Sequence, residues 1–231
     1  QRTAALAQPY EIVYPKCGIP GGGAAQREGA FSMFDRMKED IACIRDRDPA
    51  ARSALEVMLL YNGYKAVRSH RRANWCYRHN LKFLARWISQ RCVRRTNIEI
   101  HPGATIGRYF FIDHGTGIVV GETTVIGDHV KVYQGVTLGA LTTRGGQSLR
   151  GKKRHPTIED NVTIYAGASI LGGGTVIGRD SVIGSNVFIT HSIPPCTTVS
   201  VKSQELQFKP RNCEGNCASC TKPEPFWEGQ K

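Results

Sequence analysis

Residues 98–127, "IEIHPGATIGRYFFIDHGTGIVVGETTVIG", carry an aliphatic residue at nearly every sixth position, and this spacing decides the fold. A half-buried strand would alternate every second residue, and an amphipathic helix would repeat every 3.6 residues. A period of six, with a small residue often following the aliphatic one, is typical of a parallel β-helix, in which three hexads form one coil. The spacing continues well beyond this stretch, at Ile100, Ile106, Ile112 and Ile118, then Ile126, Val132 and Leu138, then Ile158, Ile164 and Ile170, and finally Ile177, Ile183 and Ile189.

One long segment interrupts the repeat. Residues 139–157, "GALTTRGGQSLRGKKRHPT", are rich in glycine and in basic residues. An insertion of this length in a stack of coils must leave the stack as an external loop. Such loops often carry function, and this one ends in an Arg-His pair.

The first part of the chain has a helical pattern. Apolar residues recur at helical spacing around residues 34–44 and 81–92, and a third helix is expected over about 63–77. Asp48-Pro49 predicts a helix start, with Asp48 as the cap. The expected fold class is therefore α+β, comprising a flexible lead-in (1–29), a helical domain (30–97), a β-helix with an external loop (98–200) and a cysteine-containing tail (201–231).

Charge and composition exclude some classes. The 231 residues carry a formal charge of +12, and no acidic residue lies between Glu56 and Glu99. That basic stretch is compatible with nucleic-acid binding or with a solvated helix surface, and the absence of a nucleic-acid-binding motif favours the surface. No apolar run is long enough to cross a membrane, and residues 1–29 lack a secretory signal. Because the chain starts at Gln1, we expect it to begin inside a longer protein.

The cysteines indicate a compartment. Five of the eight are scattered, so we expect reduced thiols and a cytoplasmic location. The other three, Cys213, Cys217 and Cys220, lie close together in the tail. Three such thiols could bind zinc or an iron–sulfur cluster with a fourth ligand from elsewhere, or they could belong to an exposed tail.

Asp113 and His114 stand side by side in an apolar run, where a lone histidine is more often structural than catalytic. Their surroundings change that expectation. The stretches "IHPGATIGRYFFIDHGTGIVVGET" (100–123), "GVTLGA" (135–140) and "KRHPTI" (153–158) resemble serine O-acetyltransferase, a family of left-handed parallel β-helix acyltransferases. The resemblance extends over residues 30–198.

The resemblance assigns roles to six residues. His114 matches the general base that removes the serine hydroxyl proton during attack on acetyl-CoA, a task that suits imidazole. Glu99 stands where the family commonly has Asp, and its carboxylate would orient that imidazole. The acids Asp48 and Asp113 match the residues that bind the substrate ammonium group. The pair Arg154 and His155 matches the residues that bind its carboxylate.

The resemblance also implies how the two substrates meet. Coenzyme A should lie between neighbouring subunits of a homotrimer or of a dimer of trimers. Positions Ala166, Gly184 and Ser185 match the surroundings of its pantetheine arm, and the Gly139 turn could donate N–H groups to the thioester oxyanion. No Ser or Cys matches a nucleophile, so direct transfer in a ternary complex is expected. L-cysteine is the inhibitor that the family implies.

The chain departs from the family pattern in three places. The loop before Arg154 is longer than usual. After "SIPPCTT", the sequence "VSVKSQELQF" replaces the usual Gly-x-Pro-Ala continuation. The chain ends in Lys231, whereas many members end in the Ile that docks into the next enzyme of cysteine synthesis, so this docking is not expected.

Other functions stay open at this stage. The acceptor could be another hydroxyl compound, such as homoserine or a sugar. A β-helix carbonic anhydrase would bind zinc through three histidines at subunit boundaries, for which the candidates are His101, His114, His129 and His155. A nucleic-acid-binding or scaffold protein would use the basic helices instead. A metal assay separates the carbonic anhydrase from the transferases, and a salt-dependent RNA or DNA shift would identify the last class.

Overall fold

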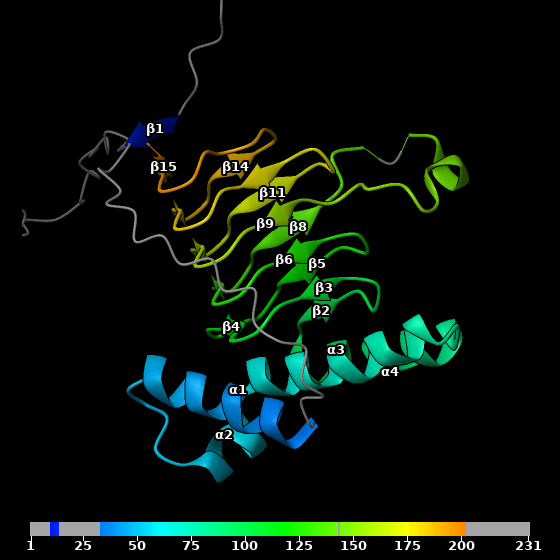
Figure 1. The fold of residues 1–231 in the computed structure, drawn as a ribbon, viewed down its shortest axis with the longest axis vertical. Helices are drawn as coiled ribbons and strands as arrows, with labels where there is room; N and C mark the ends of the chain where they lie inside the picture. The colour runs from blue at the N-terminus through cyan, green and yellow to red at the C-terminus, as the bar shows by residue number, and fades with distance from the viewer. Residues whose placement is uncertain (1–9, 14–32, 143, 202–231) are drawn as a thin grey trace, which may run out of the picture.

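The computed structural model describes residues 10–13, 33–142 and 144–201, and places four helices before a stack of parallel strands (Figure 1). The predicted order of helices and β-helix is confirmed. The helices are α1 (Met33–Arg47), α2 (Ala54–Leu60), α3 (Asn62–Arg78) and α4 (Lys82–Thr96).

The helix start predicted at Asp48 is wrong. Helix α2 begins at Ala54, and its cap is Ser53, whose hydroxyl accepts a hydrogen bond from the Glu56 amide at 3.1 Å. Asp48 instead follows the end of α1, where its side chain accepts from the Ala50 amide. Aspartate forms such local turns as readily as it caps a helix, so Asp-Pro alone does not distinguish the two.

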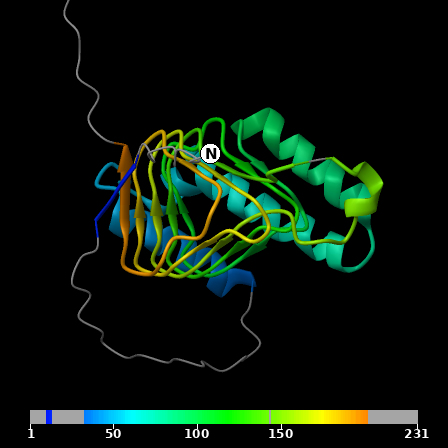
Figure 2. The same ribbon diagram turned by 90° about the horizontal axis from the view of Figure 1, so that it is seen from above.

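The strands form the three sides of a prism, seen along its length in Figure 2. The first sheet has the order β1-β15-β13-β10-β7-β4, the second β14-β11-β8-β5-β2 and the third β12-β9-β6-β3. In chain order the strands are β1 (Tyr10–Val13), β2 (Glu99–Ile100), β3 (Thr105–Ile106), β4 (Phe111–Ile112), β5 (Val119–Val120), β6 (Val125–Ile126), β7 (Lys131–Val132), β8 (Thr137–Gly139), β9 (Thr157–Ile158), β10 (Thr163–Ile164), β11 (Ser169–Leu171), β12 (Val176–Ile177), β13 (Val182–Ile183), β14 (Phe188–Ile189) and β15 (Thr198–Val201).

Stacked aliphatic side chains fill the prism. With the exception of Ile118, the residues predicted to point inward stack on their equivalents in the next coil, as Ile112 does on Val132 and Val132 on Ile164. These side chains belong to one buried cluster. Each coil hydrogen-bonds only to its neighbours, so the core is stable only as a stack.

The register of one strand differs from the prediction. Ile118 is buried, but the residue that pairs inward in β5 is Val120, which aligns with Ile100 and Leu138. The step from Ile112 to Val120 is therefore eight residues instead of six. The two additional residues enlarge the turn between β4 and β5, and that turn contains Asp113 and His114.

The helical domain closes the end of the prism next to the first coil (Figure 1). Ala66 and Val67 of α3 belong to the same buried cluster as the prism interior. The Asn74 amide donates to the Pro102 carbonyl at 2.8 Å, and the Ser89 hydroxyl of α4 donates to the Ile100 carbonyl at 2.8 Å. Helices and coils are thus held in fixed positions relative to each other, which matters for a site that uses both.

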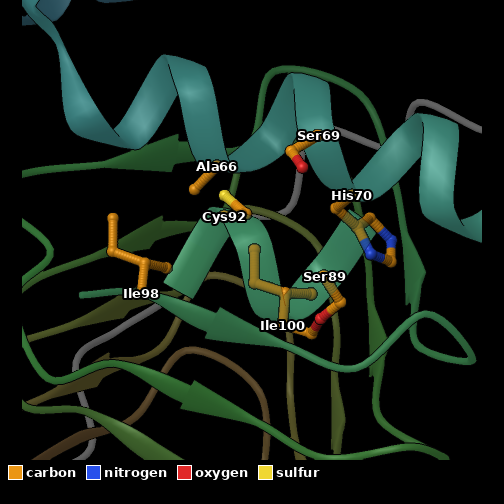
Figure 3. Close-up of a pocket in the computed structure, with 7 residues that line it drawn as sticks. All are labelled: Ala66, Ser69, His70, Ser89, Cys92, Ile98 and Ile100. Atoms are coloured by element: carbon orange, nitrogen blue, oxygen red, sulfur yellow. The ribbon is translucent and has the colours of Figure 1, made fainter. Parts of the chain in front are cut away.

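A cavity of about 10 Å³ lies at this junction, lined by α3, α4 and the first coil (Figure 3). The His70 ring faces it, and burial lowers the His70 pKa to about 4, so the imidazole is neutral. Its Nδ1 has no hydrogen-bond partner among the described residues. A cavity of this size could hold one water molecule, and we assign it a structural role.

At the far end, β1 pairs antiparallel with β15 and covers the last coil. Cys43, Cys76 and Cys92 are free thiols, as expected. Cys196, in the turn before β15, is disulfide-bonded, so the expectation of reduced thiols throughout is wrong at that position.

Candidate active site

The site residues lie at two edges of the prism. The first corner comprises the turns from the first to the second sheet, residues 113–118, 133–136, 165–168 and 184–187. The second corner comprises the turns from the second to the third sheet, residues 101–104, 121–124, 140–156 and 172–175. In each coil, one strand of the second sheet separates the two corners.

His114 lies in the enlarged turn of the first corner. Its backbone is left-handed, with φ of 57°, and its side chain is 75% exposed. The next residue, Gly115, has φ of 91°, and a Cβ there would lie 2.6 Å from Ile98 Cδ1. The turn is therefore packed closely against the core on one side and presents the imidazole to solvent on the other. The left-handed conformation is shared with other turns of the prism, as at Asn161 and Asp180, so it is the exposure of the side chain that argues against a purely structural histidine.

Glu99 lies in β2, the strand of the first coil that pairs with β5 of the next coil. Its described ionic partner is Arg86 of α4, with 3.6 Å between Nη2 and Oε1. The described residues contain no hydrogen bond between Glu99 and His114, although β2 lies directly beside β5, into which the His114 turn leads. The orienting role of Glu99 stays a prediction.

Asp48, Tyr61 and Asp113 form an acid cluster. The Tyr61 hydroxyl donates to Asp48 Oδ2 at 2.8 Å, while Asp48 Oδ1 accepts from the Ala50 amide at 2.8 Å. Burial, the hydrogen bond to Asp48 and the charges of Asp48, Glu56 and Asp113 raise the pKa of Tyr61 to about 12. Asp113 acts on the same phenol through its charge, with no hydrogen bond to Tyr61 or Asp48 among the described contacts. The cluster joins an acid at the end of α1 to an acid of the first corner.

Asp113 also contacts two other charged or titratable groups. Its Oδ2 lies 3.2 Å from Lys131 Nζ, and its Oδ1 lies 3.9 Å from His114 Nε2. The Asp113 carboxylate can stabilise a cation next to the exposed imidazole. This is the arrangement expected of a site for an ammonium group.

Arg154 and His155 lie at the second corner, where the external loop returns to the prism. Arg154 Nη2 donates to Glu122 Oε2 at 2.5 Å, and Glu122 Oε1 accepts from the Tyr77 hydroxyl at 2.9 Å. Partial burial acts to raise the Glu122 pKa, but these bonds and the charges of His101 and Arg154 lower it overall. Glu122 thus holds the guanidinium group in place as a carboxylate.

Arg154 still has binding capacity. Its side chain is 26% exposed, so part of the guanidinium group is open to solvent while Nη2 is held by Glu122. Its Nε is buried and has no hydrogen-bond partner among the described residues, so that N–H is closed to a ligand in this conformation. The exposed part of the guanidinium group is the part that can bind a carboxylate.

His155 is neutral and fixed. The Thr123 amide donates to its Nδ1 at 3.1 Å, so the neutral ring carries its proton on Nε2. Burial, followed by the charge of Arg154, lowers the His155 pKa to about 4. The ring packs so closely on Gly121 that any Cβ there would overlap it. Glycine at position 121 is what allows His155 this position, with Nε2–H as a donor.

A groove of about 390 Å³ adjoins Arg154 between the external loop and the coils above it. It is lined by Leu141, Thr142, Leu149, Lys153, Arg154, Gly172, Gly173, Gly174, Thr175, Thr190 and His191. The loop leaves the prism after β8, includes a short 3₁₀ helix (Gly146–Leu149) and extends away from the coils (Figure 1). The external loop predicted from the interrupted repeat is confirmed.

The residues expected near coenzyme A divide between the corners. Ala166, Gly184 and Ser185 follow β10 and β13 at the first corner, where the Asn186 amide donates to the Ala166 carbonyl at 2.9 Å. They lie along the same edge as His114, two and three coils away from it. Gly139 is the last residue of β8 and stands directly before the second corner. Within one chain, Gly139 therefore lies at a different edge of the prism from Ala166, Gly184 and Ser185.

The four candidate zinc histidines do not all share one place: His101 and His155 lie near each other at the second corner, whereas His114 and His129 lie elsewhere. His129 stacks on Tyr109 with 4.4 Å between ring centroids, and His101 Nδ1 accepts from the Gly103 amide at 3.0 Å. Across the described residues, no three His, Cys, Asp or Glu side chains gather as metal ligands. Cys213, Cys217 and Cys220 lie outside the described residues, and their metal site stays a prediction. No helix in the described part of the chain is long and apolar enough to cross a membrane.

Sequence reasoning missed several residues that hold the site together. Four residues contact the predicted site residues but were given no binding or catalytic role in the sequence analysis. They are Tyr61, Glu122, Thr123 and Lys131. The sequence holds no signal for these four contacts, and the eight-residue step in the hexad repeat marks only the turn that contains His114.

Comparison with known proteins identifies the family. A family model described as "Serine acetyltransferase, N-terminal" matches residues 25–69. The serine acetyltransferase of Bacillus licheniformis is 51% identical over 167 residues, which cover 72% of this chain and 74% of the relative. The Bacillus subtilis enzyme is 56% identical over 131 residues, which cover 56% of this chain and 58% of the relative.

Solved structures similar to this chain are also serine acetyltransferases. Serine acetyltransferase isoform 3 of Entamoeba histolytica, in complex with cysteine, has a TM-score of 0.70 and 38% identity over 77% of this chain and 61% of its own. The Neisseria gonorrhoeae enzyme, in complex with serine, has a TM-score of 0.65 and 34% identity, over 71% and 65%. A serine acetyltransferase complex with CoA has a TM-score of 0.63 and 36% identity, over 71% and 65%. The chain thus spans about three fifths of the length of most of these proteins.

The exposed histidine, Asp113 and the Arg-His pair lie on a left-handed β-helix of the kind that these enzymes share, and Asp48 comes from the helices beside it. The chain therefore belongs to the serine acetyltransferase family of acyltransferases.

Proposed function

We propose that this chain transfers the acetyl group of acetyl-CoA to the hydroxyl oxygen of L-serine. The observation that carries the proposal is the exposed His114 beside Asp113, the acid-cluster residue whose Oδ1 lies 3.9 Å from the His114 Nε2. His114 takes the hydroxyl proton as the serine oxygen attacks the thioester carbonyl. The C–S bond then breaks, O-acetylserine forms, and the proton passes to the coenzyme A sulfur. The relatives solved with serine, cysteine and CoA support these ligands.

The charges suit a zwitterion. The acid cluster offers carboxylates to the ammonium group, while the Arg154 guanidinium group, whose side chain is 26% exposed, and His155 Nε2 offer N–H donors to the carboxylate. Both donors are fixed before binding, because Glu122 holds the guanidinium and Thr123 holds the imidazole. Pre-organised donors reduce the entropy lost on binding.

A homotrimer would complete the site. In one chain, β5 separates the acid cluster from the Arg-His pair, and a strand with its flanking residues spans about 10 Å or more. Serine is too short to bridge that distance. Packing the first corner of one chain against the second corner of a neighbour would bring both halves together. It would also bring Gly139 of the neighbour to the edge that carries Ala166, Gly184 and Ser185.

Coenzyme A would then lie along the first corner. The edge formed by Gly184, Ser185 and Ala166 leads along the stacked coils toward His114. Serine and acetyl-CoA would bind together, with direct transfer between them. Since acetyl-CoA is an intracellular substrate, we expect a cytoplasmic location. A dimer of trimers through the helical domain is compatible with this arrangement.

Thiol release from acetyl-CoA tests the acceptor. With L-serine, homoserine and a galactoside as acceptors, we expect serine to give the highest kcat/KM. Homoserine carries its hydroxyl one methylene farther from the two charged groups, which should move the oxygen away from His114 and lower the rate. The galactoside has neither charge and should give no signal above background. Turnover with the galactoside and none with serine would overturn the proposal.

L-cysteine should inhibit in competition with L-serine. It has the same ammonium and carboxylate groups, and a thiol replaces the hydroxyl, so the acid cluster and the Arg-His pair should bind both. Initial rates at several serine concentrations should give cysteine inhibition that disappears at saturating serine. Inhibition that does not depend on serine concentration would show that cysteine binds elsewhere.

A further inference from the structure

The acid cluster already binds a cation supplied by the chain itself. Lys131 Nζ lies 3.2 Å from Asp113 Oδ2, and it lies over the Tyr133 and Phe111 rings, 4.6 and 5.1 Å from their centroids. The side chains of Lys131 and Asp113 are 22% and 24% exposed, so water screens the pair only in part. Burial acts to lower the Lys131 pKa, but hydrogen bonds to Tyr133 and Asp113 raise it overall. Lys131 is therefore charged.

The β-helix does not require this charge. Lys131 pairs in register with Phe111 in the coil before and with Thr163 in the coil after, and Thr163 pairs with Val182. These residues occupy the same outward position in successive coils. An aromatic, a small polar and an aliphatic residue are all accommodated there. The equivalent positions in the other coils show that coil packing does not require a lysine here, so Lys131 needs another explanation.

We propose that Lys131 sets the substrate affinity of the site, acting as an internal ammonium group that opposes the substrate ammonium at Asp113. This inference rests on the proposed function, which assigns Asp113 to that ammonium. Two ammonium groups on one carboxylate lie about 5 Å apart, and at partly exposed positions their repulsion corresponds to about a tenfold loss of affinity. Lys131 would lower affinity for every ligand that carries an ammonium group, and for no other.

The test compares Lys131→Met with the wild-type chain at full length. Removing the charge should lower the serine KM and the cysteine dissociation constant by about tenfold each, with a smaller change in kcat. Lys131→Arg keeps the charge and should resemble wild type. Thr163→Val alters the same outward position one coil away without changing charge, and should leave both constants unchanged.

A ligand without an amino group separates electrostatics from loosening of the fold. 3-Mercaptopropionate has the thiol and carboxylate of cysteine but no ammonium group, so Lys131→Met should not tighten its binding. The advantage of Lys131→Met for cysteine should also shrink as salt rises, because salt screens exposed charges. An unchanged or raised cysteine dissociation constant, or equal tightening of 3-mercaptopropionate, would overturn the inference.

Calorimetric binding of cysteine keeps this inference distinct from the proposed function. If the wild-type chain bound cysteine but did not acetylate serine, the proposed function would fail while the effect of Lys131 could still be measured. If serine were acetylated and Lys131→Met bound cysteine no more tightly, only the role of Lys131 would fail. A wild-type chain that bound neither amino acid would overturn both.

Discussion

Replacing His114 should lower kcat for serine acetylation by a factor of about 10²–10⁴, because the serine hydroxyl would lose its general base. The side chain is 75% exposed, so its loss should cost the fold little. The backbone needs more care, since φ is 57° at this position. Alanine is unfavourable in that region, whereas asparagine adopts it readily. His114→Asn is therefore the better variant, and His114→Ala should lose a similar amount of activity.

Two controls accompany this prediction. The elution volume and thermal midpoint of His114→Asn should match wild type, which would show that the loss is chemical. Glu99→Gln should reduce kcat less than either His114 variant, because a carboxylate that orients the base does not itself transfer the proton. Near-normal turnover by His114→Asn would mean that this histidine is structural after all.

The fold was largely predictable because the β-helix is one-dimensional. Each coil repeats the same inward aliphatic position, so a single periodicity predicts most strands of the coils and their neighbours, but not β1 or β15. The same logic located the external loop between β8 and β9, where the period fails. It misplaced Ile118, because a two-residue enlargement of one turn shifts the register without removing an aliphatic residue.

The site was less predictable for a physical reason. His114, Arg154 and His155 belong to short contiguous motifs, and a resemblance could identify them. Tyr61 contacts Asp48 across 13 residues, and Arg154 contacts Glu122 across 32, so these partners depend on how helices and coils pack. No local pattern encodes such contacts. Asp48 shows how a local motif can mislead. The Asp-Pro motif predicted a helix cap, whereas in the structure Asp48 accepts hydrogen bonds from the Ala50 amide in a turn and from the Tyr61 hydroxyl.

Arg154→Ala should weaken serine and cysteine together, raising the serine KM and the cysteine inhibition constant by about ten- to hundredfold. That range corresponds to the loss of one charge-assisted hydrogen bond, about 1.5–3 kcal/mol. Both ligands lose the same carboxylate partner, namely the partly exposed guanidinium group that Glu122 holds in place. The acetyl-CoA KM should change much less.

The matched variant Arg154→Lys keeps the positive charge but loses the planar guanidinium group. A lysine ammonium group cannot bind Glu122 and a ligand carboxylate at once in the same geometry. Its serine KM and cysteine inhibition constant should fall between those of wild type and Arg154→Ala.

Glu122→Gln tests the residue that holds the guanidinium group. It leaves Arg154 charged but weakens the bond that orients it, so it should raise the serine KM and the cysteine inhibition constant by a smaller factor than Arg154→Ala does. Initial-rate kinetics with each ligand measure all of these constants. If Arg154→Ala weakened serine and spared cysteine, the two amino acids could not share a carboxylate site, and the competition proposed between them would have to arise elsewhere on the chain.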